Sequence, residues 1–149
     1  MYPDGVFYDS RNRAVIATLL PQVQPRATAW LADCEKHGIW LLLTEGYRTW
    51  AKQAWDYASG RFRPGKIITN AKPGYSLHNF ACALDFVPAD GNGFLHYEDM
   101  TRYTQAAALA KAHGFEWGGE WPKAFRDVPH LQYTGGLSIQ DFRSGKVPA

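Results

Sequence analysis

An apolar run that contains a single carboxylate constrains the fold of this chain more than any other feature. Residues 81–86 read ACALDF, and their small, apolar and β-forming side chains predict a buried strand. Asp85 lies inside this run, and His78 precedes it by seven residues in the stretch GYSLHNF. An unpaired buried carboxylate costs several kcal/mol, so the fold must supply a partner for Asp85.

The two faces of this strand differ in bulk. We expect the strand to span residues 81–87, with side chains alternating between its faces. Ala81, Ala83 and Asp85 would share one face, where two small neighbours leave space beside the carboxylate. Leu84 and Phe86 would lie on the opposite face, which must therefore be the core face.

A second extended segment, DVPHLQY, carries His130. Pro129 favours extended backbone in the residue before it, and from His130 onward the pattern alternates, with Gln132 on the same face. Together, His78, Asp85 and His130 are the ligand set of an open zinc site, in which water takes the fourth position. Spacing alone leaves a hydrogen-bonded structural Asp85 as an open alternative.

The other three histidines have simpler interpretations. His37 and His113 each stand directly before a glycine at the end of a predicted helix, where an imidazole interacts favourably with the helix dipole. His96 lies between a turn and a helix start, so we expect it at the surface or in a capping role.

The order of predicted elements indicates the fold class. Helices are expected at 11–20, 26–37, 49–59, 99–113 and 138–142, and strands at 39–44, 66–69, 81–87, 116–117 and 130–133. This order is not a regular alternation of strand and helix. It favours an α+β fold with a small, mostly antiparallel sheet and helices packed on one side. The length of 149 residues favours one domain over 1–149.

Composition excludes several classes of protein. The net charge of +2 is too small for a nucleic-acid-binding face, and the seven-residue run AVIATLL is too short to span a membrane. Cys34 and Cys82 are far apart and form no CxxC pair, so two buried free thiols are expected. The first residues, MYPDGVFYDSRNR, lack the pattern of a secretory signal, and we expect synthesis in a cytoplasm.

Three stretches together resemble the LAS-type zinc peptidases. SLHNFACALD (76–85) is similar to the SxHxxGxAxD motif of that family, with Ala81 in place of its glycine. TEGYRTWAKQAWDYASGR (44–61) resembles the strand-then-helix segment, and HGFEWGGEWPKAFRDVPHLQY (113–133) resembles the stretch that ends in the last metal ligand. The family includes D-Ala-D-Ala carboxypeptidases, D,D-dipeptidases and phage L-alanyl-D-glutamate endopeptidases, and the resemblance implies their Hedgehog-like fold.

The resemblance also implies roles for individual residues. It places zinc on His78, Asp85 and His130. It makes Asp127, on the segment before the last ligand, the catalytic acid/base. It makes Arg48, after the first strand, an anchor for a substrate carboxylate or for the transition state, and Ser76 a polar contact to the substrate.

Other roles stay open for several of these polar residues. Asp127 could form a turn or a salt bridge beside Arg126, and Arg48 could pair with Glu45. Glu116 and Glu120 are rival bases, and Glu120 could share the acid/base role.

The expected substrate is the stem peptide of bacterial peptidoglycan. Within the family we favour a phage-type L-alanyl-D-glutamate endopeptidase, which acts as a monomer on the cell wall after release through a membrane pore. A D-Ala-D-Ala carboxypeptidase is the alternative inside the family. Two alternatives belong to other classes of protein. One is a lysozyme-like enzyme that uses Glu45 as its general acid, and the other is a non-catalytic, zinc-stabilised module that binds the cell wall. The bond cleaved, the host, the oligomeric state and any regulation by calcium stay open.

Overall fold

The computed structural model describes residues 8–149, and the turn-rich stretch 1–7 lies outside the described residues. The helices are α1 (Asp9–Ile16), α2 (Gln24–Lys36), α3 (Trp50–Ala58), α4 (Met100–Ala112) and α5 (Ile139–Arg143). The strands are β1 (Trp40–Glu45), β2 (Ala83–Ala89), β3 (Glu116–Trp117) and β4 (His130–Gln132). Three short 3-10 turns complete the order, namely η1 (Leu77–Phe80), η2 (Gly118–Glu120) and η3 (Lys123–Phe125).

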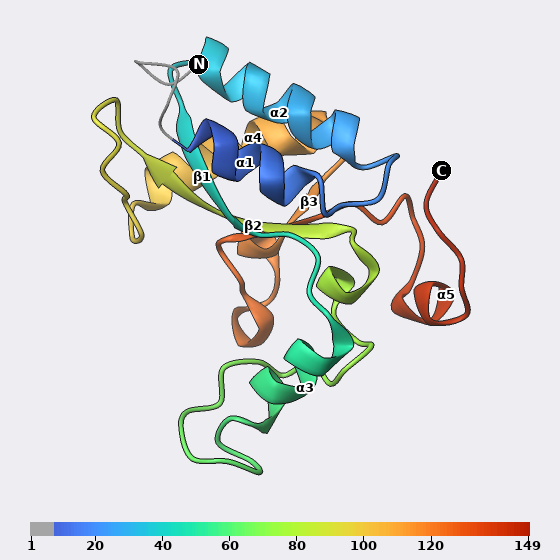
Figure 1. The fold of residues 1–149 in the computed structure, drawn as a ribbon. Helices are drawn as coiled ribbons and strands as arrows, with labels where there is room; N and C mark the ends of the chain where they lie inside the picture. The colour runs from blue at the N-terminus through green and yellow to red at the C-terminus, as the bar shows by residue number, and fades with distance from the viewer. Residues whose placement is uncertain (1–7) are drawn as a thin grey trace.

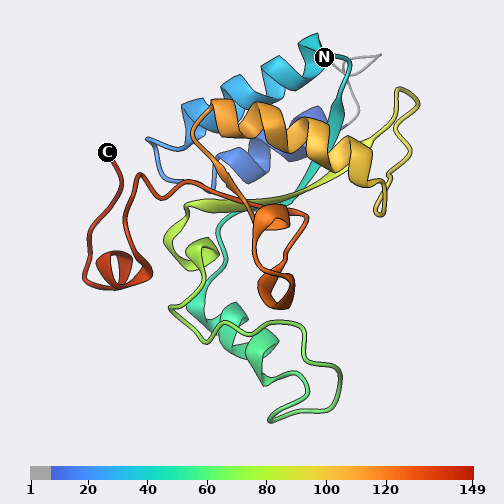
Figure 2. The same cartoon turned by 180° about the vertical axis from the view of Figure 1, so that it is seen from behind.

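The four strands form one antiparallel sheet in the order β1-β2-β4-β3. Helices α1 and α2 contact β1, and α4 contacts β2 and β3, so these three helices form a layer on one side of the sheet (Figures 1 and 2). Helix α3 lies on the other side, beyond the end of β1 (Figure 1). The expected α+β fold with an antiparallel sheet is therefore confirmed. No helix within residues 8–149 is long and apolar enough to cross a membrane.

The core lies between the helix layer and one face of β2. Trp30 of α2 is fully buried, and its ring meets Phe86 of β2 edge-on at 5.4 Å between centroids. Its indole nitrogen donates to the carbonyl of Ala106 in α4 at 2.9 Å, which satisfies the one polar atom of the ring. Leu84 shares this face and is also fully buried. Asp85, which points the opposite way, is thereby turned away from the helices.

Most predicted elements are present, with ends that differ by a few residues. The first helix ends at Ile16 rather than at residue 20, and hydrogen-bonded turns follow it. Cys34 and Cys82 are buried and unpaired as expected, and burial raises the pKa of each thiol to about 12. His37 and His113 are the C-cap residues of α2 and α4. His96 contacts Asp90 beside a turn, 3.0 Å from its Oδ2.

The strand predicted at residues 66–69 is wrong. This segment is irregular, and Ile67 and Ile68, whose β-branched side chains suggested a strand, are 58% and 61% exposed. Side chains bind its backbone instead of a neighbouring strand. Ser59 donates to the carbonyl of Lys66, and Arg61 donates to the carbonyl of Thr69. The loop therefore packs back onto α3 and forms one wall of the cleft described below.

The predicted start of the central strand is also wrong, since β2 begins at Ala83 rather than at residue 81. Ala81 closes the 3-10 turn η1 in the left-handed conformation, with φ 57° and ψ 31°. The sequence did not predict this left-handed residue, because left-handed backbone is normally indicated by a glycine and not by an alanine. The glycine of the resembling motif would fit here without strain.

We predict that Ala81→Gly stabilises the protein. Left-handed backbone costs an L-residue about 1–2 kcal/mol, and the extra freedom of glycine in the unfolded chain offsets about 0.4–1 kcal/mol of this. The net gain of about 1 kcal/mol should raise the thermal midpoint by about 2–4 °C in circular dichroism. Ala83→Gly, two residues later inside β2, is the control and should lower the midpoint. A lower thermal midpoint for Ala81→Gly would contradict the inference that the left-handed backbone of Ala81 is strained.

Candidate metal centre

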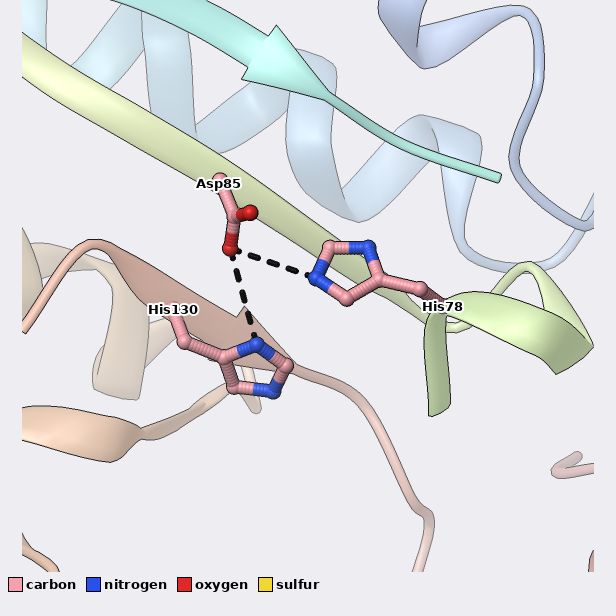
Figure 3. A group of neighbouring side chains, drawn as sticks. All are labelled: His78, Asp85 and His130. Atoms are coloured by element: carbon pink, nitrogen blue, oxygen red, sulfur yellow. Dashed lines mark hydrogen bonds and ion pairs between the residues drawn. The ribbon is translucent and has the colours of Figure 1, made fainter. Parts of the chain in front are cut away.

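Three ligand-type side chains converge on the sheet face opposite the helices (Figure 3). The register of β2 and β4 pairs Asp85 directly with His130, and η1 places His78 beside them. Asp85 Oδ1 lies 3.2 Å from His78 Nε2 and 3.6 Å from His130 Nδ1. One ligand atom from each residue lies within 4.8 Å of the other two, so the group could hold a metal ion.

These spacings fit a small tetrahedral ion. Zinc bound at about 2.0–2.1 Å by nitrogen and oxygen places neighbouring ligand atoms about 3.4 Å apart. The distances from Asp85 Oδ1 to the two imidazole nitrogens, 3.2 and 3.6 Å, lie close to this value. Both imidazoles are buried, whereas the side chain of Asp85 keeps 23% of its surface exposed toward a cleft. The donor set therefore fits zinc with one position open to the cleft.

The orientation of His78 is fixed by a backbone carbonyl. Its Nδ1 lies 2.7 Å from the oxygen of Gly46, which can only accept, so Nδ1 carries the proton and Nε2 faces Asp85. Gly46 is required here, because a Cβ would lie 2.3 Å from Thr18 Oγ1 and 2.9 Å from the carbonyl of Val15. Glycine in GYR thus lets the chain approach closely enough to orient a ligand.

The electrostatics favour an ionised Asp85. Burial acts to raise the pKa of Asp85, but its interactions with the imidazoles of His130 and His78 outweigh burial and hold the pKa well below its usual value. Burial acts to lower the pKa of His130, and its interaction with the Asp85 carboxylate overcomes this and raises the pKa. The two imidazoles thus offset the free-energy cost of burying the charged Asp85 carboxylate. A bound dication would replace any protons on the imidazole nitrogens that face Asp85.

Ser76 lies at the cleft and also orders the first ligand. It is the N-cap of η1, where its Oγ accepts from the backbone nitrogen of His78 at 3.3 Å. Asn79 completes a capping box and donates to the carbonyl of Arg48 at 3.1 Å. The backbone nitrogen of Arg48 in turn donates to the carbonyl of His78. The motif residues thus tie η1 to the segment that follows β1.

Arg48 is next to the cluster, but its donors are engaged within the protein. Its Nε and Nη2 donate to Glu45, and its Nη1 donates to Gln53 at 2.8 Å. Nη2 also lies 3.9 Å from Asp85 Oδ2. Burial acts to lower the pKa of Arg48, and the hydrogen bond with Glu45 raises it, so the guanidinium stays charged. The expected pair with Glu45 is present at the site itself.

Gln53 is a site residue to which the sequence assigned no role. It is fully buried in α3, accepts from Arg48 and donates to the carbonyl of Ala71 at 2.8 Å. Its position in the segment 44–61, which resembles the family, was the signal that could have pointed to it.

Asp127 is the carboxylate with room to act beside the cluster. Its Oδ2 lies 3.9 Å from His130 Nδ1, and its side chain is 52% exposed toward the cleft. Burial raises the pKa of Asp127 above its ordinary value. The rival Glu120 pairs with Lys111 at the surface, and the rival Glu116 accepts hydrogen bonds at the rim of the site.

The cluster of His78, Asp85 and His130 opens into a cleft of about 570 Å³. One wall is the irregular segment 68–76, and the opposite wall includes Trp121, whose ring packs 5.1 Å from His130. Leu137 and Ile139 line one end of the cleft. A cleft of this size, lined mainly by polar groups that converge on one point, can hold a short peptide.

We predict that the wild-type chain binds about one equivalent of zinc. His130→Ala and Asp85→Asn should each weaken zinc binding more than about 100-fold, because losing a ligand costs more affinity than losing a residue that supports a ligand. Competition with a chelating dye measures the affinity. His113→Ala removes an imidazole remote from the cluster and should bind zinc as the wild type does. Wild-type affinity in either ligand variant would exclude this site.

Comparisons with known proteins agree with this geometry. The family described as D-alanyl-D-alanine carboxypeptidase matches residues 69–133. The peptidoglycan L-alanyl-D-glutamate endopeptidase CwlK of Bacillus subtilis is 35% identical over 130 residues, which cover 82% of this chain and 77% of that protein. The L-alanyl-D-glutamate peptidase of Listeria phage A118 is 34% identical over 144 residues, which cover 93% of this chain but only 47% of the phage protein.

The fold also matches a solved structure. The crystal structure of Serratia marcescens L-Ala D-Glu endopeptidase ChiX aligns over 95% of this chain and 98% of that one, with a TM-score of 0.64 and 22% identity. This match shows the fold, and the identity to CwlK over most of both chains shows the family. The chain belongs to the LAS-type peptidase family, which unites D-alanyl-D-alanine carboxypeptidases with L-alanyl-D-glutamate endopeptidases.

Proposed function

We propose that the protein is a zinc-dependent peptidoglycan peptidase that cleaves the L-Ala–D-Glu bond of the stem peptide. The observation that carries this proposal is the meeting of His78, Asp85, His130 and Asp127 in one cleft. The choice of bond is supported by the two relatives named for L-alanyl-D-glutamate cleavage.

Zinc would be held by His78 Nε2, Asp85 Oδ1 and His130 Nδ1. When bound in such a site, zinc lowers the pKa of a coordinated water from about 15.7 to about 7 and polarises a carbonyl. The protein supplies two neutral imidazoles whose outer nitrogens are hydrogen-bonded and one carboxylate that is held ionised.

Asp127 is assigned the proton transfers. Peptide hydrolysis requires a base that takes a proton from the attacking water and an acid that gives it to the leaving amine. Asp127 Oδ2 is beside the ligand cluster, and its backbone nitrogen is anchored to the carbonyl of Gly118 at 2.9 Å. A raised pKa suits a carboxyl group that must both accept and return a proton.

Arg48 and Ser76 are assigned supporting roles toward the substrate. Arg48 places a positive charge 3.9 Å from Asp85 Oδ2, where it would stabilise negative charge that develops on the substrate carbonyl. Glu45 and Gln53 already engage three of the five N–H donors of Arg48, so these contacts restrict how the guanidinium can meet a substrate carboxylate. Ser76 lines the cleft and offers a hydroxyl to the peptide.

Three alternatives make different predictions. A D-Ala-D-Ala carboxypeptidase, the description of the matching family, would release D-Ala alone. A lysozyme-like enzyme would require Glu45 as a proton donor, but Glu45 is paired with Arg48. A non-catalytic binding module would need no Asp127. We further propose that the chain acts as a monomer on the cell wall after passing through a membrane pore; the phage relative, named for cleavage of a peptidoglycan bond, supports the cell wall as its place of action.

We predict that digestion of purified peptidoglycan by the wild-type protein exposes new N-terminal D-Glu, and that a chelator stops it. Asp127→Ala should lower turnover by at least about 100-fold while zinc stays bound, because positioned acid–base catalysis contributes 10²–10⁴-fold. Labelling of new amino termini and metal analysis of the same samples measure both effects.

Glu120→Ala is the matched control, since it removes a carboxylate that is paired at the surface. It should keep wild-type turnover. Release of D-Ala without new D-Glu termini would contradict the proposed bond, and near-normal activity of Asp127→Ala would contradict the proposed acid/base.

A further inference from the structure

A chain of hydrogen bonds continues from His130 to the rim of the sheet. His130 Nε2 lies 2.9 Å from Gln132 Oε1, and Gln132 Nε2 donates to Glu116 Oε2 at 2.9 Å. Thr134 Oγ1 donates to the other carboxylate oxygen of Glu116 at 3.0 Å. Glu116 and Gln132 are cross-strand partners in the register of β3 and β4, so the sheet itself brings them together.

The chemistry of the three groups allows only one arrangement of protons. An ionised carboxylate only accepts hydrogen bonds, so Glu116 requires the amide nitrogen of Gln132 to face it. The amide oxygen of Gln132 must then face His130, and this oxygen also only accepts. In the neutral ring Nε2 of His130 therefore carries the proton and Nδ1 does not, because Nδ1 lies 3.6 Å from Asp85 Oδ1, which is beyond hydrogen-bond distance.

We propose that Glu116 and Gln132 are positioning residues that fix the tautomer of His130 and so present Nδ1 to the metal. A free histidine populates both tautomers, and the wrong one would place a proton where the ion must bind. The proposal rests on the metal site of the proposed function. It assigns Glu116 a task distinct from that of a base, since Glu116 acts here through two other side chains.

Zinc affinity and the tautomer itself test this proposal. Gln132→Leu and Glu116→Ala should each raise the zinc Kd about 10- to 100-fold, the usual effect of losing a residue that supports a ligand. In the metal-free protein, ¹⁵N shifts of the His130 ring, recorded where the ring is neutral, should show protonated Nε2 in the wild type. The same ring should show a mixture of tautomers in Gln132→Leu.

An exchange of the two residues separates positioning from general damage. In the double variant E116Q/Q132E the amide donates to the carboxylate and the carboxylate accepts from His130, so zinc affinity and tautomer should return toward wild type. Gln140→Leu is the control for the loss of an exposed glutamine and should leave both unchanged. Wild-type zinc affinity in Gln132→Leu, or a double variant that binds no better than Gln132→Leu, would overturn the proposal.

A second observation concerns the cleft beyond Asp127. A hollow of about 590 Å³ continues from the metal cleft and shares Tyr75, Trp121 and Asp127 with it. Phe125 and Arg126 line only this second hollow, and both are exposed. The groove therefore extends past the proposed acid/base on the side of residues 124–126.

Arg126 is the free cation of this groove. Arg48 and Arg126 are the arginines that line the two hollows, and the charge of Arg48 is already paired with Glu45. Arg126 forms no salt bridge or side-chain hydrogen bond with any residue in 8–149.

The proposed reaction gives the groove a direction. Asp127 must lie beside the leaving amine in order to protonate it, so the residue that carries this amine occupies the Asp127 side. In an L-Ala–D-Glu bond that residue is D-Glu, whose α-carboxyl group is attached to the same carbon as the amine. We infer that Arg126 pairs with this α-carboxylate, and the inference rests on the proposed cleavage.

Two soluble stem peptides test this subsite. One carries D-Glu with a free α-carboxylate, and the other carries the α-amide. Arg126→Gln should lower kcat/KM about 10-fold for the carboxylate peptide, the contribution of a charge-assisted hydrogen bond, and leave the amide peptide unchanged. Lys123→Gln removes the same charge three residues away, outside both hollows, and should change neither value.

An equal loss on both peptides, or no loss on either, would overturn the role of Arg126 while leaving the cleavage itself intact. A wild-type protein that cleaves neither peptide would overturn the proposed function together with this subsite.

Discussion

The contact between the Asp85 carboxylate and two imidazoles is the interaction on which the functional half of the structure depends. Asp85 is placed by β2, His130 by the adjacent β4, and His78 by the turn that leads into β2. The other face of β2 is bound into the core through Leu84 and Phe86, so the strand cannot shift without disturbing both sides. One strand thus couples the hydrophobic core to the polar cluster.

Each ligand is held by a different outer contact. The carbonyl of Gly46 orients His78, Gln132 orients His130, and Arg48 lies near the second oxygen of Asp85. A cluster whose members are oriented before metal arrives loses little conformational freedom on binding. The same elements form the walls of the cleft, so one small sheet carries both the candidate metal centre and the cleft beside it.

The resemblance to the LAS-type peptidases predicted the centre of the candidate site from the sequence, and periodicity alone had left a structural Asp85 as an open alternative. The alternation around Asp85 and His130 is a local signal, and it placed both residues on the correct face. The boundary at Ala81 was missed because a left-handed alanine looks like any strand residue. The false strand at 66–69 arose from two β-branched residues whose surroundings, a loop folded onto α3, are set by tertiary contacts.

The supporting residues of the site could not be predicted for a related reason. Gln132 was placed on the His130 face, but its link to Glu116 depends on the register between two strands of two and three residues. Such register is fixed by the whole sheet and leaves no local pattern. Likewise, the engagement of Arg48 by Gln53 depends on where α3 packs.

Anomalous diffraction at the zinc absorption edge, from crystals grown with zinc, tests the central claim most directly. The account predicts a single strong peak about 2.0–2.2 Å from His78 Nε2, Asp85 Oδ1 and His130 Nδ1. A peak at any other group of side chains, or none within reach of these three atoms, would contradict it.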